Sequence, residues 1–125
     1  MSVSIISVEH VNVKVDPAVE DAAKNVYGTV LGLQEVPKPM ELRSRGGAWY
    51  QLGAVQLHLS RDGNAANEGT KRHICLLVGD ISQAQAGFTD AGVEIIPDDE
   101  PIAGSPRFYV RDPGGNLLEI AQRKG

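Results

Sequence analysis

The chain has 125 residues, of which 42% are hydrophobic and 22% are charged, and its formal net charge at pH 7 is −4. This length is typical of one globular domain, and the composition argues against a disordered or membrane-embedded chain. No block of basic residues offsets the negative charge, so nucleic acid and membranes are not expected as partners, and a small-molecule substrate is favoured.

The first fifteen residues, MSVSIISVEHVNVKV, lack the basic start and the cleavage site of a signal peptide. Polar residues also interrupt them too often for a membrane-spanning helix. The single cysteine, Cys75, excludes an intramolecular disulfide and any zinc or redox motif built on paired cysteines. We therefore expect a cytoplasmic protein in which Cys75 is a small buried hydrophobic residue.

In chain order, the first half predicts a strand, a helix and a series of short strands. Apolar and polar residues alternate over residues 5–15, as in a strand with one apolar face. Asp16 and Pro17 are typical of a helix start, the apolar positions up to residue 31 follow helical spacing, and Gly32 ends the segment. Strand-like runs follow at 33–36, 40–43, 48–52 and 55–60.

The second half repeats this order after a polar linker at residues 61–72. A strand is predicted at 73–78, and a helix at 81–91 between a capping Asp80 and Gly92. Strands follow at 93–96, 106–111 and 117–122, with the turn sequence DPGGN at 112–116 between the last two.

The chain therefore reads as βαβββ written twice, which predicts an α+β fold in a single domain, residues 1–125. Module one covers about residues 3–60 and module two about residues 73–122. Polar residues repeat with the modules: His73 follows His10 by 63 positions, and Glu119 follows His58 by 61.

These four residues are the candidate metal ligands. Each one alone is more simply explained as a structural or solvated strand residue, but their repeated spacing within predicted strands favours a shared site. Apolar neighbours flank each of them, so one strand face can build the core while the other holds polar chemistry. Histidine with a carboxylate is typical of Zn, Ni, Co, Mn or Fe sites rather than of Ca or Mg sites.

Four segments, HVNVKV, YGTVLGL, RHICLLVGD and RFYVRDPGGNLLEIAQ, resemble the vicinal oxygen chelate superfamily, which includes glyoxalase I, extradiol dioxygenases and bleomycin-binding proteins. The resemblance covers nearly the whole chain. It implies paired βαβββ modules whose curved mixed sheets enclose a divalent metal, and a homodimer. The implied metal ligands are His10, His58, His73 and Glu119.

The resemblance implies a glyoxalase-like lyase or isomerase, in which a metal chelates two neighbouring substrate oxygens and stabilises an enediolate. Glu119 and His58 are the implied catalytic residues. His58 stands where typical glyoxalase I has glutamate, which leaves Glu119 as the one carboxylate base. His58 is then either a fourth ligand or a second base, and the more positive site favours an anionic substrate.

Three other functions stay open. In an extradiol-type Fe(II) dioxygenase, His10, His73 and Glu119 would bind iron and His58 would act as acid or base. In a fosfomycin-modifying enzyme three metal ligands suffice, so His58 would not be needed as a fourth. A bleomycin-resistance type protein would bind a drug or metabolite without catalysis. Substrate-contact candidates, which ordinary strand packing also explains, are Trp49, Tyr50, Gln56, Arg107 and Tyr109.

Overall fold

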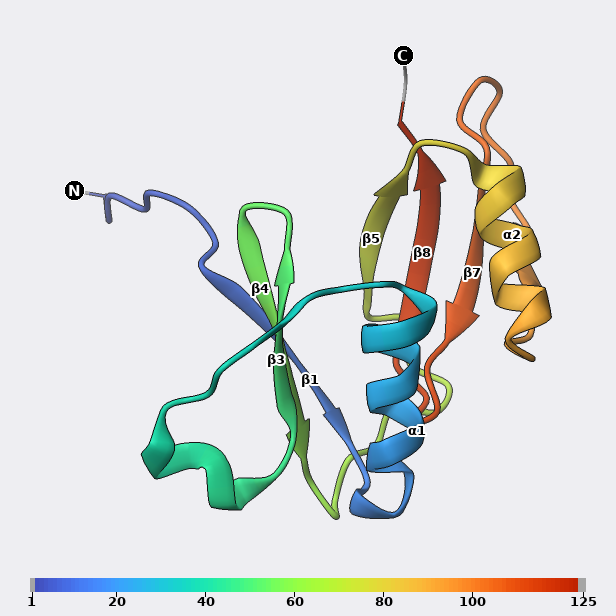
Figure 1. Ribbon diagram of the computed structural model, residues 1–125. Coiled ribbons are helices and arrows are strands. Elements are labelled where there is room, and N and C mark those ends of the chain that lie inside the picture. The colour runs from blue at the N-terminus through green and yellow to red at the C-terminus, as the bar shows by residue number, and fades with distance from the viewer. Residues whose placement is uncertain (1, 124–125) are drawn as a thin grey trace.

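The computed structural model describes residues 2–123, and its strands form two four-stranded sheets that stand apart rather than closing into one barrel (Figure 1). In spatial order, the first sheet contains β1 (His10–Val15), β4 (Val55–Arg61), β3 (Ala48–Leu52) and β2 (Glu35–Val36). The second contains β5 (His73–Val78), β8 (Leu117–Gln122), β7 (Arg107–Arg111) and β6 (Ile96–Pro97). Only β1–β4 and β5–β8 are parallel pairs. The predicted tandem βαβββ fold is confirmed.

The first predicted helix is a continuous run of three helical types. It consists of a 3-10 turn (Pro17–Val19), α1 (Glu20–Asn25) and a π-helical turn (Val26–Val30). Asp16 starts the run by accepting a hydrogen bond from the Ala18 amide at 2.8 Å.

The second helix, α2 (Ile81–Asp90), starts where Asp80 accepts a hydrogen bond from the Gln83 amide at 3.1 Å. Within residues 2–123, no helix is long and apolar enough to cross a lipid bilayer.

Three predicted strands are wrong in part, and the one predicted at 33–36 keeps only Glu35–Val36. The first begins at His10 rather than residue 5, because His10 already pairs with the start of β4 and earlier residues have no strand to join within one copy. Ile6 is consequently 98% exposed. The strand predicted at 93–96 is reduced to β6, because the Val93 amide closes the end of α2 by donating to the Phe88 carbonyl.

The strand predicted at 40–43 is instead a 3-10 helix, Met40–Arg45. The apolar residues Met40 and Leu42 imitate the alternation of a strand. They do not share a buried strand face, because Met40 is 75% exposed while Leu42 is half-buried. Pro39 precedes the segment with φ −52°, and no neighbouring strand is there to pair with it.

The apolar faces of both sheets contribute to one core. Leu57 and Leu59 of β4, and Leu118 and Ile120 of β8, are almost wholly buried in it. Aromatic side chains of both helical segments fill the same core. Because strand side chains alternate, the other face of each sheet points away from this core and carries the polar residues.

A buried hydrogen-bond cluster around Asp112 joins the modules. The Tyr27 hydroxyl, from the first module, donates to Asp112 Oδ2 at 2.6 Å, and the Asn116 side chain donates to the same oxygen at 2.9 Å. The Gly114 and Asn116 amides donate to Oδ1, each at 2.9 Å. Burial and the Asp112 charge raise the Tyr27 pKa well above its usual value, so the hydroxyl keeps the proton that it donates.

Two asparagines fasten the end of β1 to the second module. The side-chain amides of Asn67 and Asn116 both donate to the Lys14 carbonyl, at 2.7 and 3.0 Å. Asn67 also donates to the Gly114 carbonyl at 2.9 Å. The polar linker is therefore tied to both modules.

We predict that Tyr27→Phe lowers the free energy of unfolding by about 1.5 to 3 kcal/mol, since it removes a buried hydrogen bond to a carboxylate. Tyr50→Phe is the matched control, because Tyr50 is also buried but its hydroxyl makes no hydrogen bond within residues 2–123. Urea unfolding should show a loss of less than about 1 kcal/mol for the control. Equal losses in the two variants would contradict the proposed role of the Asp112 cluster.

Candidate functional site

The two histidines of the first module lie next to each other because of strand register. His10 of β1 pairs with Gln56 of β4, and His58 lies two residues further along β4 on the same face. The two imidazole rings stack, with centroids 4.1 Å apart and planes inclined by 15°. We call His10 and His58 the imidazole pair.

The second module places His73 and Glu119 in the same way. His73 of β5 pairs with Leu117 of β8, and Glu119 lies two residues further along β8. His73 Nε2 is 3.1 Å from Glu119 Oε1. We call these residues the imidazole–carboxylate pair. Both modules thus carry a pair at equivalent positions, as the repeated spacing predicts.

Neighbouring side chains hold the imidazole pair. Trp49, opposite His58 on β3, stacks on it with centroids 3.9 Å apart and planes inclined by 1°. Gln56 Oε1 lies 2.9 Å from His58 Nε2. His58 is only 8% exposed, and burial, together with the charge of His10, lowers its pKa. The ring is therefore neutral at pH 7, as a metal ligand or a general base must be.

The imidazole–carboxylate pair also has an aromatic and a basic neighbour. Tyr109 lies opposite Glu119 on β7 and meets His73 edge-on, with centroids 5.9 Å apart. Arg107 Nη1 is 3.9 Å from Glu119 Oε2, while its Nε donates to Asp98 Oδ2 at 2.7 Å. Trp49, Gln56, Arg107 and Tyr109 thus lie on the two polar faces.

Tyr50 and Cys75 are placed wrongly by the sequence interpretation. Tyr50 follows Trp49 along β3, so its side chain points into the core and is 1% exposed. Cys75 is exposed, because it lies on the open polar face with its Sγ 3.4 Å from Glu119 Oε2. Desolvation and the neighbouring Glu119 raise the Cys75 pKa, which keeps the thiol protonated at pH 7.

Each pair consists of side chains of the kinds that bind transition metals. Ligand atoms about 2.1 Å from one six-coordinate metal lie about 3.0 Å apart, which matches the separation of His73 Nε2 and Glu119 Oε1. Within residues 2–123, however, no three His, Cys, Asp or Glu side chains are close enough to hold one ion. The two pairs of a single copy therefore do not form one four-ligand centre.

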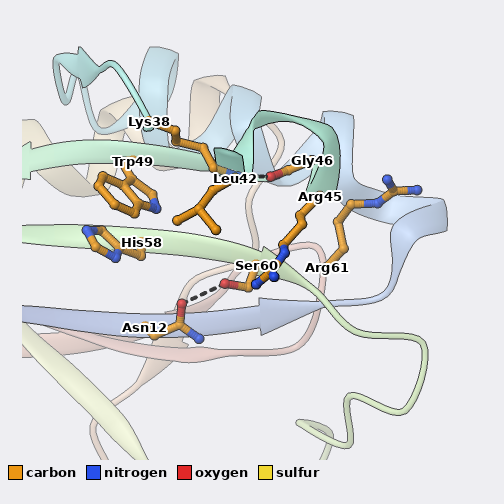
Figure 2. Close-up of a pocket in the computed structure, with 9 residues that line it drawn as sticks. All are labelled: Asn12, Lys38, Leu42, Arg45, Gly46, Trp49, His58, Ser60 and Arg61. Atoms are coloured by element: carbon orange, nitrogen blue, oxygen red, sulfur yellow. Dashed lines mark hydrogen bonds between the residues drawn. The ribbon is translucent and has the colours of Figure 1, made fainter. Parts of the chain in front are cut away.

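A cavity of about 310 Å³ opens beside the imidazole pair (Figure 2). Besides Trp49 and His58, its wall includes the polar residues Asn12, Lys38, Arg45 and Ser60. Asn12 and Ser60 share strand parity with His10 and His58, so alternation alone could have identified them. Arg45 ends the 3-10 segment, and Lys38 lies just before it. Because residues 40–43 are predicted as a strand, nothing in the pattern indicates that these two residues line a cavity.

A family model described as the glyoxalase/bleomycin resistance protein/dioxygenase superfamily matches residues 10–120. The chain belongs to this superfamily. A glyoxalase family protein from Bacillus anthracis, solved by crystallography, is 32% identical, with a TM-score of 0.85 over 99% of this chain and 100% of the other. No curated protein sequence matches the chain.

Two more distant superfamily members share the fold. A lactoylglutathione lyase from Agrobacterium tumefaciens is 20% identical, with a TM-score of 0.72 over 95% of each chain. The fosfomycin resistance protein FosX from Listeria monocytogenes is 13% identical, with a TM-score of 0.80 over 97% of this chain and 96% of the other. At these identities the likeness extends to the fold alone.

We predict that the metal-free protein loses stability as the pH falls below about 6.5. Folding lowers the His58 pKa, so the unfolded chain binds a proton at this residue more readily than the folded chain does. The free energy of unfolding therefore keeps falling until the pH has dropped below the folded-state pKa. Thermal unfolding in chelator, from about pH 7.5 to about pH 5.5, should show a smaller decrease in Tm for His58→Gln than for the unchanged protein. Identical decreases would show that His58 does not contribute.

Proposed function

We propose that this superfamily member is a divalent-metal-dependent lyase or isomerase that abstracts a proton next to a substrate carbonyl. The observation that carries the proposal is the 3.1 Å separation of His73 Nε2 and Glu119 Oε1, with an imidazole pair at the equivalent register of the other module. Zn, Ni, Co, Mn and Fe all suit such ligands.

We further propose that the metal centre is completed by a second copy of the chain. The pairs lie on separate sheets, and the core faces of both sheets are already used inside one copy. In a homodimer, the imidazole pair of one protomer would meet the imidazole–carboxylate pair of its partner. His10, His58, His73 and Glu119 would then surround one ion, with two such sites per dimer.

Glu119 is the proposed general base. Its side chain is largely buried and is positioned by His73 and Arg107, so a carboxylate oxygen can take a proton from a substrate carbon and return it to the neighbouring carbon. A bound metal would supply Lewis-acid stabilisation of the resulting oxyanion. His58, held by Trp49 and Gln56, would act as a ligand or as the second base.

The side chains opposite the pairs are the proposed substrate contacts. Trp49 and Tyr109 would flank the substrate from the two sheets, and Gln56 and Arg107 offer polar groups on the same faces. Cytoplasmic localisation stays part of this proposal and rests on the single cysteine, which suits a reducing compartment.

We predict that Glu119→Gln lowers metal affinity at least about tenfold and lowers turnover by about 100-fold or more, because one residue is both ligand and base. Metal content follows from elemental analysis after purification without chelator, and turnover from isomerisation of the hemithioacetal of methylglyoxal and glutathione. Cys75→Ser is the matched control: it lies beside Glu119 outside the ligand set, and should leave both values unchanged.

Three outcomes would overturn parts of this proposal. Absence of bound metal in the unchanged protein would favour a drug- or metabolite-binding protein. Oxygen consumption with a catechol and Fe(II), together with no hemithioacetal turnover, would favour an extradiol-type dioxygenase. A loss of bound metal in Cys75→Ser as large as that in Glu119→Gln would make Cys75 a ligand as well.

A further inference from the structure

Two of the three cations that line the cavity beside the imidazole pair, Lys38 and Arg45, have no carboxylate partner within residues 2–123. Among the described residues, Arg45 has neither a hydrogen-bond partner nor an ion-pair partner, and Lys38 Nζ bonds only to the Gly46 carbonyl. Arg61 differs, because its Nε lies 3.0 Å from Glu20 Oε1. None of the described residues that line the cavity is acidic. The cavity is thus positive in a chain whose net charge is −4.

Neutral groups of the cavity add a hydrogen-bond donor. The Ser60 hydroxyl donates to Asn12 Oδ1 at 2.7 Å, which orients the amide and leaves Asn12 Nδ2 without a hydrogen-bond partner within residues 2–123. Figure 2 shows the Arg45 side chain running from the 3-10 segment toward the strands that carry Ser60 and Asn12. A guanidinium, an ammonium and the Asn12 side chain therefore line one space.

The segment that carries the cations is anchored to the body of the protein. The Gly47 amide donates to Glu20 Oε2 at 2.7 Å, and Arg43 Nε donates to the Lys38 carbonyl at 3.2 Å. Gly47 has φ 74°, and a side chain there would overlap the Leu59 carbonyl oxygen. This close turn holds the 3-10 segment against β4.

We infer that this cavity binds an anionic oxygen group, a carboxylate or a phosphate, carried by a small-molecule ligand. Arg45 and Lys38 would neutralise its charge, and Asn12 would donate a hydrogen bond to it. Because His58 and Trp49 lie in the same wall, the rest of the ligand would extend along the imidazole pair. The inference names a substrate class for the proposed site and, in that respect, rests on the proposed function.

The chain offers a local probe for this binding, since Trp49 is its one tryptophan and lines the cavity. Full-length protein, freed of metal with chelator and then of the chelator by gel filtration, is titrated with inorganic phosphate and, separately, with succinate, and Trp49 fluorescence is recorded. Sodium chloride at equal ionic strength corrects for screening. We expect a saturable change with at least one anion; saturation by phosphate alone or by succinate alone identifies which oxygen group the cavity prefers.

Three variants make the test specific to the cavity. Arg45→Gln should weaken binding roughly five- to tenfold, as expected for loss of a charged hydrogen bond, and Arg45→Lys should weaken it less. Arg72→Gln removes the same charge from an exposed position outside the cavity, and should leave affinity unchanged. Circular dichroism establishes that each variant is folded.

The inference is overturned if neither anion gives a saturable signal beyond that of sodium chloride, or if Arg45→Gln and Arg72→Gln weaken binding equally. Because the titration is made without metal, its result is independent of the metal proposal. Anion binding without metal binding would leave the cavity assignment standing, and metal binding without anion binding would refute the cavity assignment alone.

Discussion

The parallel pairing of the first and last strands of each module is the constraint on which the candidate site depends. It sets His10 diagonally beside His58 and His73 diagonally beside Glu119, each two residues beyond the direct partner. The same alternation sends the intervening residues into the core, so a register shift of one residue would move polar groups into the core and apolar groups out. Fold stability and ligand placement therefore depend on the same backbone hydrogen bonds.

The two halves share this geometry but differ in charge. The first presents two imidazoles, one buried against Trp49, beside a cavity bordered by Lys38 and Arg45. The second presents an imidazole and a carboxylate, with Arg107 held near both Glu119 and Asp98. A metal between such halves would have one carboxylate for proton transfer, and the surrounding cations would favour a negatively charged substrate.

Much of this arrangement follows from local sequence patterns. Strand periodicity, helix caps and the repeated spacing predict both modules and place each candidate ligand on a polar face. The 40–45 segment could not be predicted, because Met40 and Leu42 imitate strand alternation while no strand is available to pair with them. Alternation places Cys75 on the same face as His73, but whether that face is covered, and how far apart the two pairs lie, depend on how the sheets pack, which short-range periodicity does not encode.

In the proposed homodimer, one metal centre takes two ligands from each of two copies. Complementation tests it most directly: a variant with His10 and His58 replaced by alanine is mixed, after unfolding and refolding together, with one in which His73 and Glu119 are replaced. Each variant alone should bind no metal. The mixture should regain metal sites in its heterodimers, because there the intact imidazole pair of one chain meets the intact imidazole–carboxylate pair of the other. A mixture that binds no more metal than its separate components, although heterodimers form, would contradict the claim.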